Sequence, residues 1–251
     1  MAETILVTGA SAGFGQAICR RLVADGHRVI GAARRIEKLQ ALHEELGEAF
    51  YPLQMDVTDL TQVDQALASL PKAWEQIDVL VNNAGLALGL APAQKAETAD
   101  WLTMIQTNII GLTYLTRQIL PQMVERNDGY VINMGSTAGT VPYPGANVYG
   151  ASKAFVKQFS LNLRADLAGK QIRVTNIEPG LCEGTEFSSV RFKGDEKWVE
   201  ALYRDAHAIQ PEDIANTVSW LIQQPKHVNV NRIEIMPVSQ TFGPQPVYRG
   251  D

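Results

Sequence analysis

The chain has 251 residues, of which 45% are hydrophobic and 20% are charged, and its formal net charge is −5. This length and composition are typical of one globular domain that buries a large core. The acidic balance excludes a generally basic surface for nucleic acid or anionic membranes, so any bound anion must be held by a local group of donors.

Cysteine usage and hydropathy indicate a soluble protein of the cytoplasm. The two cysteines are Cys19 and Cys182, and we expect reduced thiols rather than a disulfide framework. The first residues lead directly into an apolar run without the basic and apolar regions of a signal peptide. No apolar run reaches the length of a membrane span, so we expect no membrane partner.

Short apolar runs alternate with amphipathic segments of helical length along the whole chain, a pattern typical of strands covered on both faces. The predicted strands are residues 4–8, 28–32, 50–55, 79–82, 130–134, 173–177 and 232–236. The predicted helices are residues 16–24, 37–46, 61–70, 101–125, 151–167 and 212–223. This alternation predicts an α/β fold: a single domain over residues 1–251 with a doubly wound parallel sheet. A loop-rich insertion at about 180–197 and an irregular tail at 239–251 depart from it.

A glycine-rich segment, Thr8-Gly9-Ala10-Ser11-Ala12-Gly13-Phe14-Gly15, follows the first predicted strand and opens the first predicted helix. A pyrophosphate requires bare backbone N–H groups and the positive end of a helix at this place. Three glycines alone are a weak signal, because tight turns use glycine for structural reasons. The position inside a βαβ unit favours a dinucleotide site.

The end of the second predicted strand distinguishes NADP(H) from NAD(H). An NAD site has an acidic residue there that accepts a hydrogen bond from the ribose 2′-OH. This chain instead has Arg34 and Arg35, with no acid before Glu37, so nothing is expected to repel a 2′-phosphate. The alternative is that one or both arginines are solvated residues at the start of a helix. The sequence therefore predicts NADP(H).

Polar residues also follow the third and fourth predicted strands. Asp56 and Val57 are predicted to contact the cofactor, with Asp56 accepting a hydrogen bond from the adenine amino group. A helix cap or an Asx-turn at 56–59 explains Asp56 equally well. The segment Asn82-Asn83-Ala84-Gly85 either ends a strand or lies at the carboxyl edge of the sheet, where open α/β folds bind ligands.

Four further residues form a candidate catalytic group. Tyr149 and Lys153 are four residues apart on one helix face, although chance alone supplies roughly a quarter of such a match. Ser136 follows the fifth predicted strand, and Asn108 lies within a helix that it does not favour. Reduction of a carbonyl requires a proton donor, and we expect the Lys153 ammonium to lower the pKa of the Tyr149 phenol toward the working range.

Taken in this order, these motifs resemble the short-chain dehydrogenases/reductases over essentially the whole chain. The resemblance implies a Rossmann fold with strand order 3-2-1-4-5-6-7, a homotetramer, and a tetrad in which Tyr149 is the acid/base. Ser136 would orient the substrate oxygen, Lys153 would bind the nicotinamide ribose, and Asn108 would hold a water. The predicted cofactor contacts are Thr8, Gly9, Ser11, Gly13, Phe14, Gly15, Arg34, Arg35, Asp56, Val57, Asn83, Tyr149, Lys153, Pro179, Gly180 and Thr185.

A narrower resemblance rests on residues 81–89, 184–188 and 190–195, which are similar to bacterial NADP-dependent 3-hydroxy acid dehydrogenases. That group includes serine/allo-threonine dehydrogenases and malonic semialdehyde reductases, with sulfoacetaldehyde reductases as near relatives. The resemblance implies a small acidic hydroxy compound, such as 3-hydroxypropionate, serine or allo-threonine, or the corresponding aldehyde. Reduction of sulfoacetaldehyde to isethionate is the alternative.

Arg191, in the insertion, is a candidate clamp for the acidic group of the substrate, because a guanidinium matches a carboxylate or a sulfonate. The alternative is a surface ion pair with Glu186 or Asp195. Asn147 and Tyr143 are weaker candidates for lining the pocket, and the tail 239–251 is a candidate for reaching a neighbouring subunit. The four histidines are scattered without ligand spacing, so no metal is expected. A non-enzymatic NADP(H) sensor is disfavoured because every member of the tetrad is present.

Overall fold

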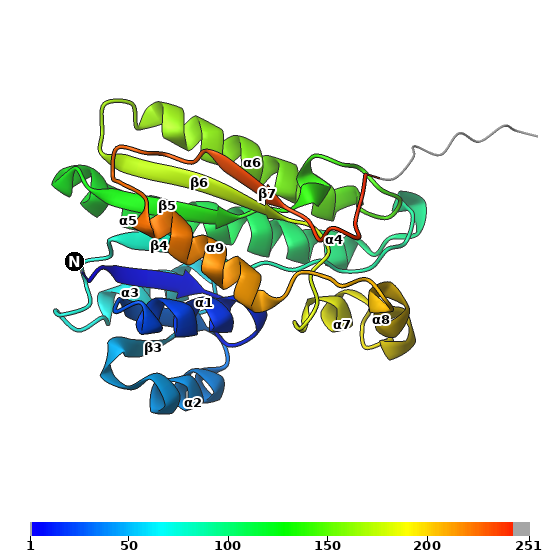
Figure 1. Ribbon diagram of the computed structural model, residues 1–251, viewed down its shortest axis with the longest axis horizontal. Coiled ribbons are helices and arrows are strands. Elements are labelled where there is room, and N and C mark those ends of the chain that lie inside the picture. Colours follow the sequence, from blue (N-terminus) through cyan, green and yellow to red (C-terminus); the bar gives the residue numbers. More distant parts are fainter. Residues whose placement is uncertain (1, 243–251) are drawn as a thin grey trace, which may run out of the picture.

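The computed structural model describes residues 2–242 of the chain. Seven parallel strands form one sheet in the order β3-β2-β1-β4-β5-β6-β7 (Figure 1). They are β1 (Thr4–Thr8), β2 (Arg28–Ala33), β3 (Phe50–Gln54), β4 (Val79–Asn82), β5 (Gly129–Met134), β6 (Ile172–Pro179) and β7 (Arg232–Ile235). The predicted fold class, the predicted strands and the predicted strand order are confirmed. The order reverses between β1 and β4, so a crevice is expected outside their carboxyl ends.

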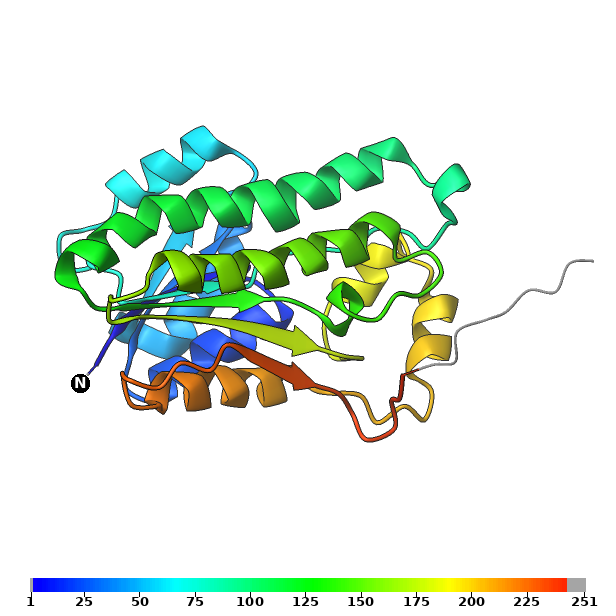
Figure 2. The same cartoon turned by 90° about the horizontal axis from the view of Figure 1, so that it is seen from above.

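Helices cover both faces of the sheet, and two short helices of the insertion lie beyond the carboxyl ends of the strands. They are α1 (Gly13–Ala24), α2 (Ile36–Leu46), α3 (Leu60–Ala68), α4 (Thr98–Ile105), α5 (Leu112–Arg126), α6 (Asn147–Asp166), α7 (Phe187–Arg191), α8 (Glu196–Tyr203) and α9 (Pro211–Gln223). Because side chains alternate along a strand, Ile5 and Val7 join the core under α1 and α9, whereas Leu6 joins the core under α3, α5 and α6. Figure 2 shows these layers, with α1 and α9 on one side of the sheet and α5 and α6 on the other.

The predicted single helix over 101–125 is wrong in one respect. A π-helical turn, η3 (Gln106–Gly111), separates α4 from α5. Its last residue is a glycine for a steric reason, since a Cβ at Gly111 would lie 2.6 Å from the carbonyl oxygen of Val57. π-turns of this kind are frequent at functional sites, and this one contains Asn108.

The insertion after β6 is also more regular than predicted. It contains the short helix α7 and the helix α8, and it extends to the start of α9 at Pro211. Asp195 caps α8 by accepting hydrogen bonds from the backbone of Lys197 and Trp198, a signal that could have predicted the helix. In the predicted irregular tail, residues 239–242 contain no helix or strand, and residues 243–251 lie outside the described residues.

Residues 2–242 show neither a membrane span among their helices nor a cluster of metal ligands. None of the helices described there is long and apolar enough to span a bilayer. The same residues contain no group of three or more histidine, cysteine, aspartate or glutamate side chains arranged to hold a metal ion.

Candidate active site

The turn between β1 and α1 forms a cradle of backbone N–H groups. Gly9 and Gly13 have φ angles of +68° and +51°, which glycine adopts freely. A Cβ at Gly15 would overlap the carbonyl oxygen of Gly9, so the close approach of the two backbones requires glycine. Phe14 packs against the core, and α1 begins without a side-chain cap. Free N–H groups at the positive end of a helix fit a pyrophosphate.

The carboxyl ends of β1 and β4 are tied together beside this cradle. The Thr8 hydroxyl accepts hydrogen bonds from the backbone N–H groups of Asn83 (3.0 Å) and Ala84 (2.9 Å). The Asn83 amide donates in return to the carbonyl of Thr8 at 2.8 Å. Thr8 and Asn83 thus fix the ends of β1 and β4 relative to each other, at the place where the strand order reverses. Their contacts with a cofactor remain predictions.

A cluster of charged side chains occupies the predicted 2′-phosphate site at the end of β2. Arg35 donates from Nε (3.2 Å) and NH2 (3.1 Å) to the Ser11 hydroxyl, whereas Arg34 is exposed. Glu186 of the insertion forms ion pairs of 2.9 Å with both Arg35 and Lys38. Hydrogen bonds from Arg35 and then Lys38 lower the pKa of Glu186 to about 2.

The prediction that no acid lies near Arg34 and Arg35 is therefore wrong. Glu186 is 151 positions away in sequence from Arg35, and only the packing of the insertion brings it there. Lys38 was also missed, although its position three residues after Arg35 on α2 places both cations on one helix face.

Asp56 forms the Asx-turn that was its alternative interpretation. Its carboxylate accepts hydrogen bonds from the backbone N–H (2.9 Å) and the hydroxyl (2.7 Å) of Thr58. Asp59, not Asp56, caps α3 by accepting from the backbone N–H of Gln62 at 3.0 Å. The neighbouring Val57 is buried. The adenine contact predicted for Asp56 remains a prediction.

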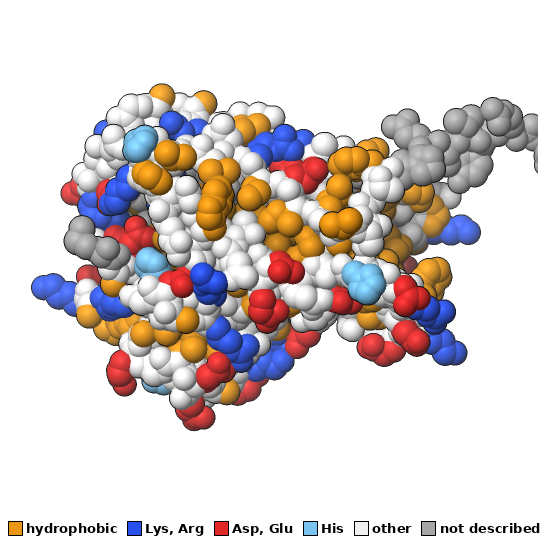
Figure 3. Space-filling view, viewed as in Figure 1, with side chains coloured by type: hydrophobic (Ala, Val, Ile, Leu, Met, Phe, Trp, Pro, Cys, Tyr) orange, Lys and Arg blue, Asp and Glu red, His pale blue; other side chains and the backbone are white. Residues whose placement is uncertain are grey.

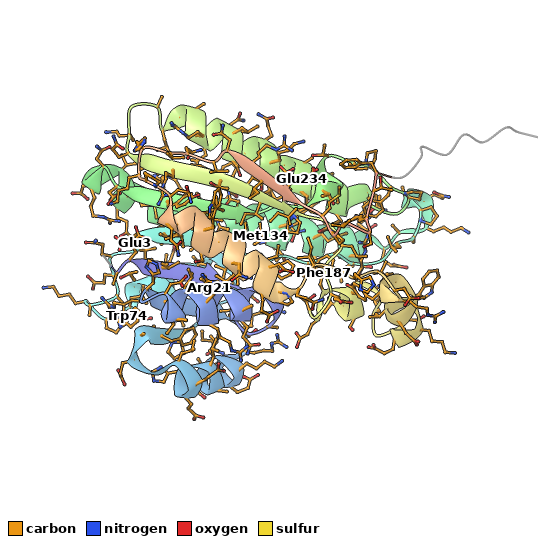
Figure 4. The ribbon with its side chains drawn as sticks, viewed as in Figure 1. Glu3, Arg21, Trp74, Met134, Phe187 and Glu234 are labelled. Atoms are coloured by element: carbon orange, nitrogen blue, oxygen red, sulfur yellow. The ribbon has the colours of Figure 1, made fainter. Side chains whose placement is uncertain are left out.

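The fold brings Tyr149, Lys153 and Ser136 together at the carboxyl ends of β5 and β6. Tyr149 and Lys153 lie on α6, with the Lys153 ammonium 5.9 Å from the centre of the Tyr149 ring. The Ser136 hydroxyl is close enough to the Tyr149 phenol to lower its pKa. The ammonium donates to the carbonyl of Met134 at 2.8 Å. Figure 4 marks Met134 at the end of β5 and Phe187 at the start of α7, and the Phe187 ring lies 5.8 Å from that of Tyr149.

Asn108 is held by the backbone beyond β4. Its amide accepts from the N–H of Leu86 and donates to the Leu86 carbonyl, both at 2.9 Å, and donates to the Ser152 hydroxyl at 3.0 Å. A Cβ at Gly85 would lie 3.2 Å from the Asn108 amide oxygen and 3.3 Å from the Lys153 ammonium. The π-turn thus directs Asn108 toward Lys153, with the small Gly85 between the two side chains.

The electrostatics of this pair differ from the prediction. Burial raises the pKa of Tyr149 to about 12, and the nearby Ser136 hydroxyl and the charge of Arg191 offset only part of this rise. Burial also lowers the pKa of Lys153 to about 8. The expected lowering of the phenol pKa by Lys153 is therefore wrong for the protein without ligand, because loss of hydration outweighs nearby charge.

The end of β6 connects the tetrad to the glycine turn. The Pro179 carbonyl accepts from the Ser136 hydroxyl at 3.4 Å, and the backbone N–H of Gly180 donates to β7 at Ile235. The Thr185 side chain would lie 3.0 Å from a Cβ at Gly13. Pro179 thus lies beside Ser136 and Thr185 beside Gly13, and the cofactor contacts of Pro179, Gly180 and Thr185 remain predictions.

Arg191 lies over the Tyr149 phenol. Its guanidinium carbon is 5.4 Å from the centre of the Tyr149 ring and 5.4 Å from that of Tyr143. It donates to the Tyr143 hydroxyl at 2.9 Å and to the Gly89 carbonyl at 3.4 Å. The alternative, an ion pair with Glu186 or Asp195, is not formed, since Glu186 pairs with Arg35 and Lys38. Arg191 is thus placed beside the group that would carry the reacting proton.

Asn147 has a different position from the one expected of a pocket wall. Its side chain accepts from the indole N–H of Trp101 (3.1 Å) and from the backbone of Val148 (2.8 Å), and it donates to the Ala91 carbonyl (3.2 Å). These contacts use its polar atoms to join α4, the loop after β4 and the start of α6. Its contact with a substrate remains a prediction.

Comparison with known proteins shows to which family the chain belongs. A model of the short chain dehydrogenases matches residues 3–196, which is more than half of the chain. This protein belongs to the short-chain dehydrogenase family. The chain is 59% identical over 245 residues to the NADP-dependent 3-hydroxy acid dehydrogenase YdfG of Salmonella typhi, covering 98% of this chain and 99% of that one. It is 52% identical over 249 residues to a serine 3-dehydrogenase of Agrobacterium fabrum, covering 99% of each.

Solved structures of serine dehydrogenases are also similar to this chain. A serine dehydrogenase in its closed form with NADP⁺ has a TM-score of 0.97 and 56% identity, covering 98% of this chain and all of that one. The serine dehydrogenase of Escherichia coli has a TM-score of 0.85 and 53% identity, covering 95% of this chain and all of that one. The predicted family is confirmed, and the predicted oxidoreductase class and NADP(H) dependence agree with these relatives.

Proposed function

We propose that this dehydrogenase uses NADP(H) to interconvert a small acidic 3-hydroxy compound and its aldehyde or ketone. The observation that carries the proposal is the Arg191 guanidinium, whose carbon lies 5.4 Å from the centre of the Tyr149 ring. A substrate oxygen hydrogen-bonded to Tyr149 would then have its acidic group within reach of Arg191 only if few carbons separate the two. Carboxylates of the 3-hydroxypropionate, serine and allo-threonine type meet this condition.

The residues of the cradle support NADP(H) as the partner in this reaction. The first turn of α1 and its glycines would hold the pyrophosphate, and Ser11, Arg34 and Arg35 would hold the 2′-phosphate. Thr8, Asn83, Pro179, Gly180 and Thr185 would border the nicotinamide half, and Asp56 and Val57 the adenine. Bound NADP(H) supplies or accepts the hydride.

In the proposed reaction the side chains of the tetrad transfer the proton. In the reductive direction Tyr149 would give its phenolic proton to the substrate oxygen, and in the oxidative direction it would take that proton back. Ser136 would hydrogen-bond the same oxygen and orient it. Lys153 lies beside the phenol, and its positive charge would stabilise the phenolate that forms during reduction. Asn108, fixed by Leu86, would hold the water that returns the proton.

A rate comparison tests the proposal and separates it from its alternatives. NADPH and NADH would each be assayed with malonic semialdehyde, sulfoacetaldehyde and an uncharged aldehyde, and NADP⁺ with serine and 3-hydroxypropionate. We expect NADPH and the carboxylated aldehyde to give the highest kcat/KM. A higher kcat/KM for sulfoacetaldehyde would instead assign a reductase that forms isethionate, since a guanidinium also matches a sulfonate. Absence of turnover with every compound would favour an NADP(H)-binding regulatory protein.

The proposed assembly is a homotetramer of the cytoplasm. Trp220 on α9 is 47% exposed and Val228 before β7 is 36% exposed, and Figure 3 shows hydrophobic side chains spread over this face of the molecule. Such surface is typical of contacts between subunits. Both cysteines are free thiols, which fits a reducing compartment. Light scattering should give a mass of about 110 kDa, four times that of the 27.5 kDa chain.

The arrangement of the insertion is proposed to be the closed one. The TM-score of 0.97 to a closed, NADP⁺-bound serine dehydrogenase supports this assignment. In that arrangement α7 and α8 lie beyond the carboxyl ends of the strands, as Figure 1 shows.

A further inference from the structure

Glu186 joins the insertion to the cofactor half of the molecule. It is the residue before α7, and its carboxylate lies 2.9 Å from Arg35 NH2 and 2.9 Å from Lys38 Nζ. This carboxylate and Lys38 take no part in the catalytic tetrad or in the substrate clamp. Both also line a cleft of about 720 Å³ between the glycine turn and the insertion, together with Gly13 and Thr185.

The other end of α7 is fixed to the opposite wall of the site. The carbonyl of Arg191 accepts from the backbone N–H of Gly89 at 2.9 Å, and Lys193 forms a 2.9 Å ion pair with Asp100. The helix has five residues, which corresponds to a length of about 7 Å. Glu186 and Arg191 are therefore the two ends of one short strap that crosses the site.

Arg35 presents two different edges of its guanidinium to oxygen acceptors. The Nε/NH2 edge of its guanidinium faces Ser11, and the NH1/NH2 edge faces Glu186. A planar guanidinium can bind one oxyanion along each edge. A 2′-phosphate and Glu186 together carry about three negative charges, which the three cations Arg34, Arg35 and Lys38 can balance.

We propose that Glu186 is a positioning residue that fastens α7 to Arg35 and Lys38, so that one strap links the 2′-phosphate site to the substrate clamp Arg191. The inference rests on the cofactor and substrate sites proposed above. When the 2′-phosphate binds at the Ser11 edge of Arg35, it fixes the guanidinium that holds Glu186. That contact keeps Arg191 over Tyr149, and by linkage a bound acidic substrate strengthens cofactor binding by the same factor.

The first test compares Glu186→Gln with Glu186→Asp and with the control Glu200→Gln, which removes an exposed carboxylate of the same insertion that is paired with Arg204. Isothermal titration with NADP⁺ should give a dissociation constant about fivefold higher for Glu186→Gln, as expected for a partly exposed ion pair. Glu186→Asp should recover part of the loss, and Glu200→Gln should match the parent. An unchanged dissociation constant would overturn the proposal. A lower one would overturn it too, because it would mean that Glu186 competes with the phosphate.

The second test follows the substrate end of the strap. Glu186→Gln should raise KM for a carboxylated aldehyde about fivefold, leave KM for an uncharged aldehyde unchanged, and leave kcat near the parent value. Equal KM changes for both aldehydes would overturn the link to Arg191. The double variant Lys38→Gln/Glu186→Gln should be less impaired than the product of the two single effects, since both remove one contact. If the effect of the double variant equalled the product of the two single effects, the proposed contact between Lys38 and Glu186 would be ruled out.

Hydrogen exchange separates this inference from the proposed function. In the protein without cofactor, Glu186→Gln should speed exchange of the backbone amides of residues 186–191, because the ion pairs exist without ligand. Unchanged exchange would overturn the strap whatever the cofactor assays show. If Arg35→Ala left the preference for NADP⁺ over NAD⁺ intact, the proposed 2′-phosphate site would be contradicted. The exchange result would still show whether Glu186 holds α7 in place.

Discussion

The Lys153 ammonium donates a 2.8 Å hydrogen bond to the carbonyl oxygen of Met134, the last residue of β5. This contact draws the ammonium to the carboxyl edge of the sheet, where both residues are buried. The hydrogen bond satisfies one of three donors of a charged group, so burial still costs free energy. The lowered pKa of Lys153, about 8, reflects that cost.

A pH-dependent stability follows from Lys153. Since its pKa is lowered from 10.5 to about 8 in the folded state, its contribution to stability is fully present above about pH 10.5 and is lost as the pH falls through about 8. Relative to Lys153→Met, the parent should therefore gain about 2 to 3 kcal/mol in the free energy of unfolding between about pH 7 and about pH 10. Urea denaturation of both proteins at the two pH values measures this, and a constant difference would contradict it.

Tyr149→Phe tests the acid/base assignment. Loss of the phenolic proton should lower kcat by about a hundred- to ten-thousandfold, the usual range for general acid–base catalysis. Binding of NADP⁺ and the circular dichroism spectrum should be retained. Tyr114→Phe is the control, because its phenol bonds the surface residue Asp64 away from the site. Turnover of Tyr149→Phe near the parent rate would remove the assignment.

Arg191→Ala tests the substrate clamp. A charge-assisted pair with a carboxylate contributes about 1.5 to 3 kcal/mol, so KM for an acidic aldehyde should rise by about tenfold or more. KM for an uncharged aldehyde should change far less. Arg204→Ala removes a guanidinium of the same insertion that pairs with Glu200, and it should behave as the parent. Equal losses on both aldehydes would show that Arg191 has no role in recognising the acid.

The cofactor preference tests Arg34 and Arg35. Replacing both by alanine should lower the ratio of kcat/KM for NADPH over NADH by about tenfold or more, because the 2′-phosphate loses its cationic partners. Arg20→Ala, which removes an arginine paired with Glu45 on the surface, should keep the parent ratio. If the parent already used NADH as well as NADPH, the interpretation of both arginines would be wrong.

Gly15→Ala tests the cradle. The added Cβ would overlap the Gly9 carbonyl and lie 2.7 Å from the Asn83 amide nitrogen, so the turn must shift. We expect a loss of about 1 to 3 kcal/mol in stability together with weaker NADP⁺ binding. Gly26→Ala is the comparison, since its positive φ of +88° costs stability in open surroundings remote from the turn. Normal cofactor affinity in Gly15→Ala would contradict the assigned role.

The sequence by itself determined the α/β alternation, the strand order through its resemblance, and the order of the site motifs. These features are local: strands and helices follow from side-chain periodicity, and the glycine turn follows from backbone requirements of a few adjacent residues. The π-turn at Asn108 was missed because its six residues are too few to define a period of their own within a long helical pattern.

Only the tertiary structure decided which charged side chains meet in the site and what their pKa values are. Glu186 meets Arg35 across 151 positions, and Arg191 meets Gly89 across 102, through the packing of an insertion with no strong pattern of its own. The pKa values of Tyr149 and Lys153 likewise depend on burial, which raises that of Tyr149, against the direction that the spacing of the pair predicted, and lowers that of Lys153. Hydration is lost only when the whole fold closes over a side chain, so sequence spacing cannot reveal it.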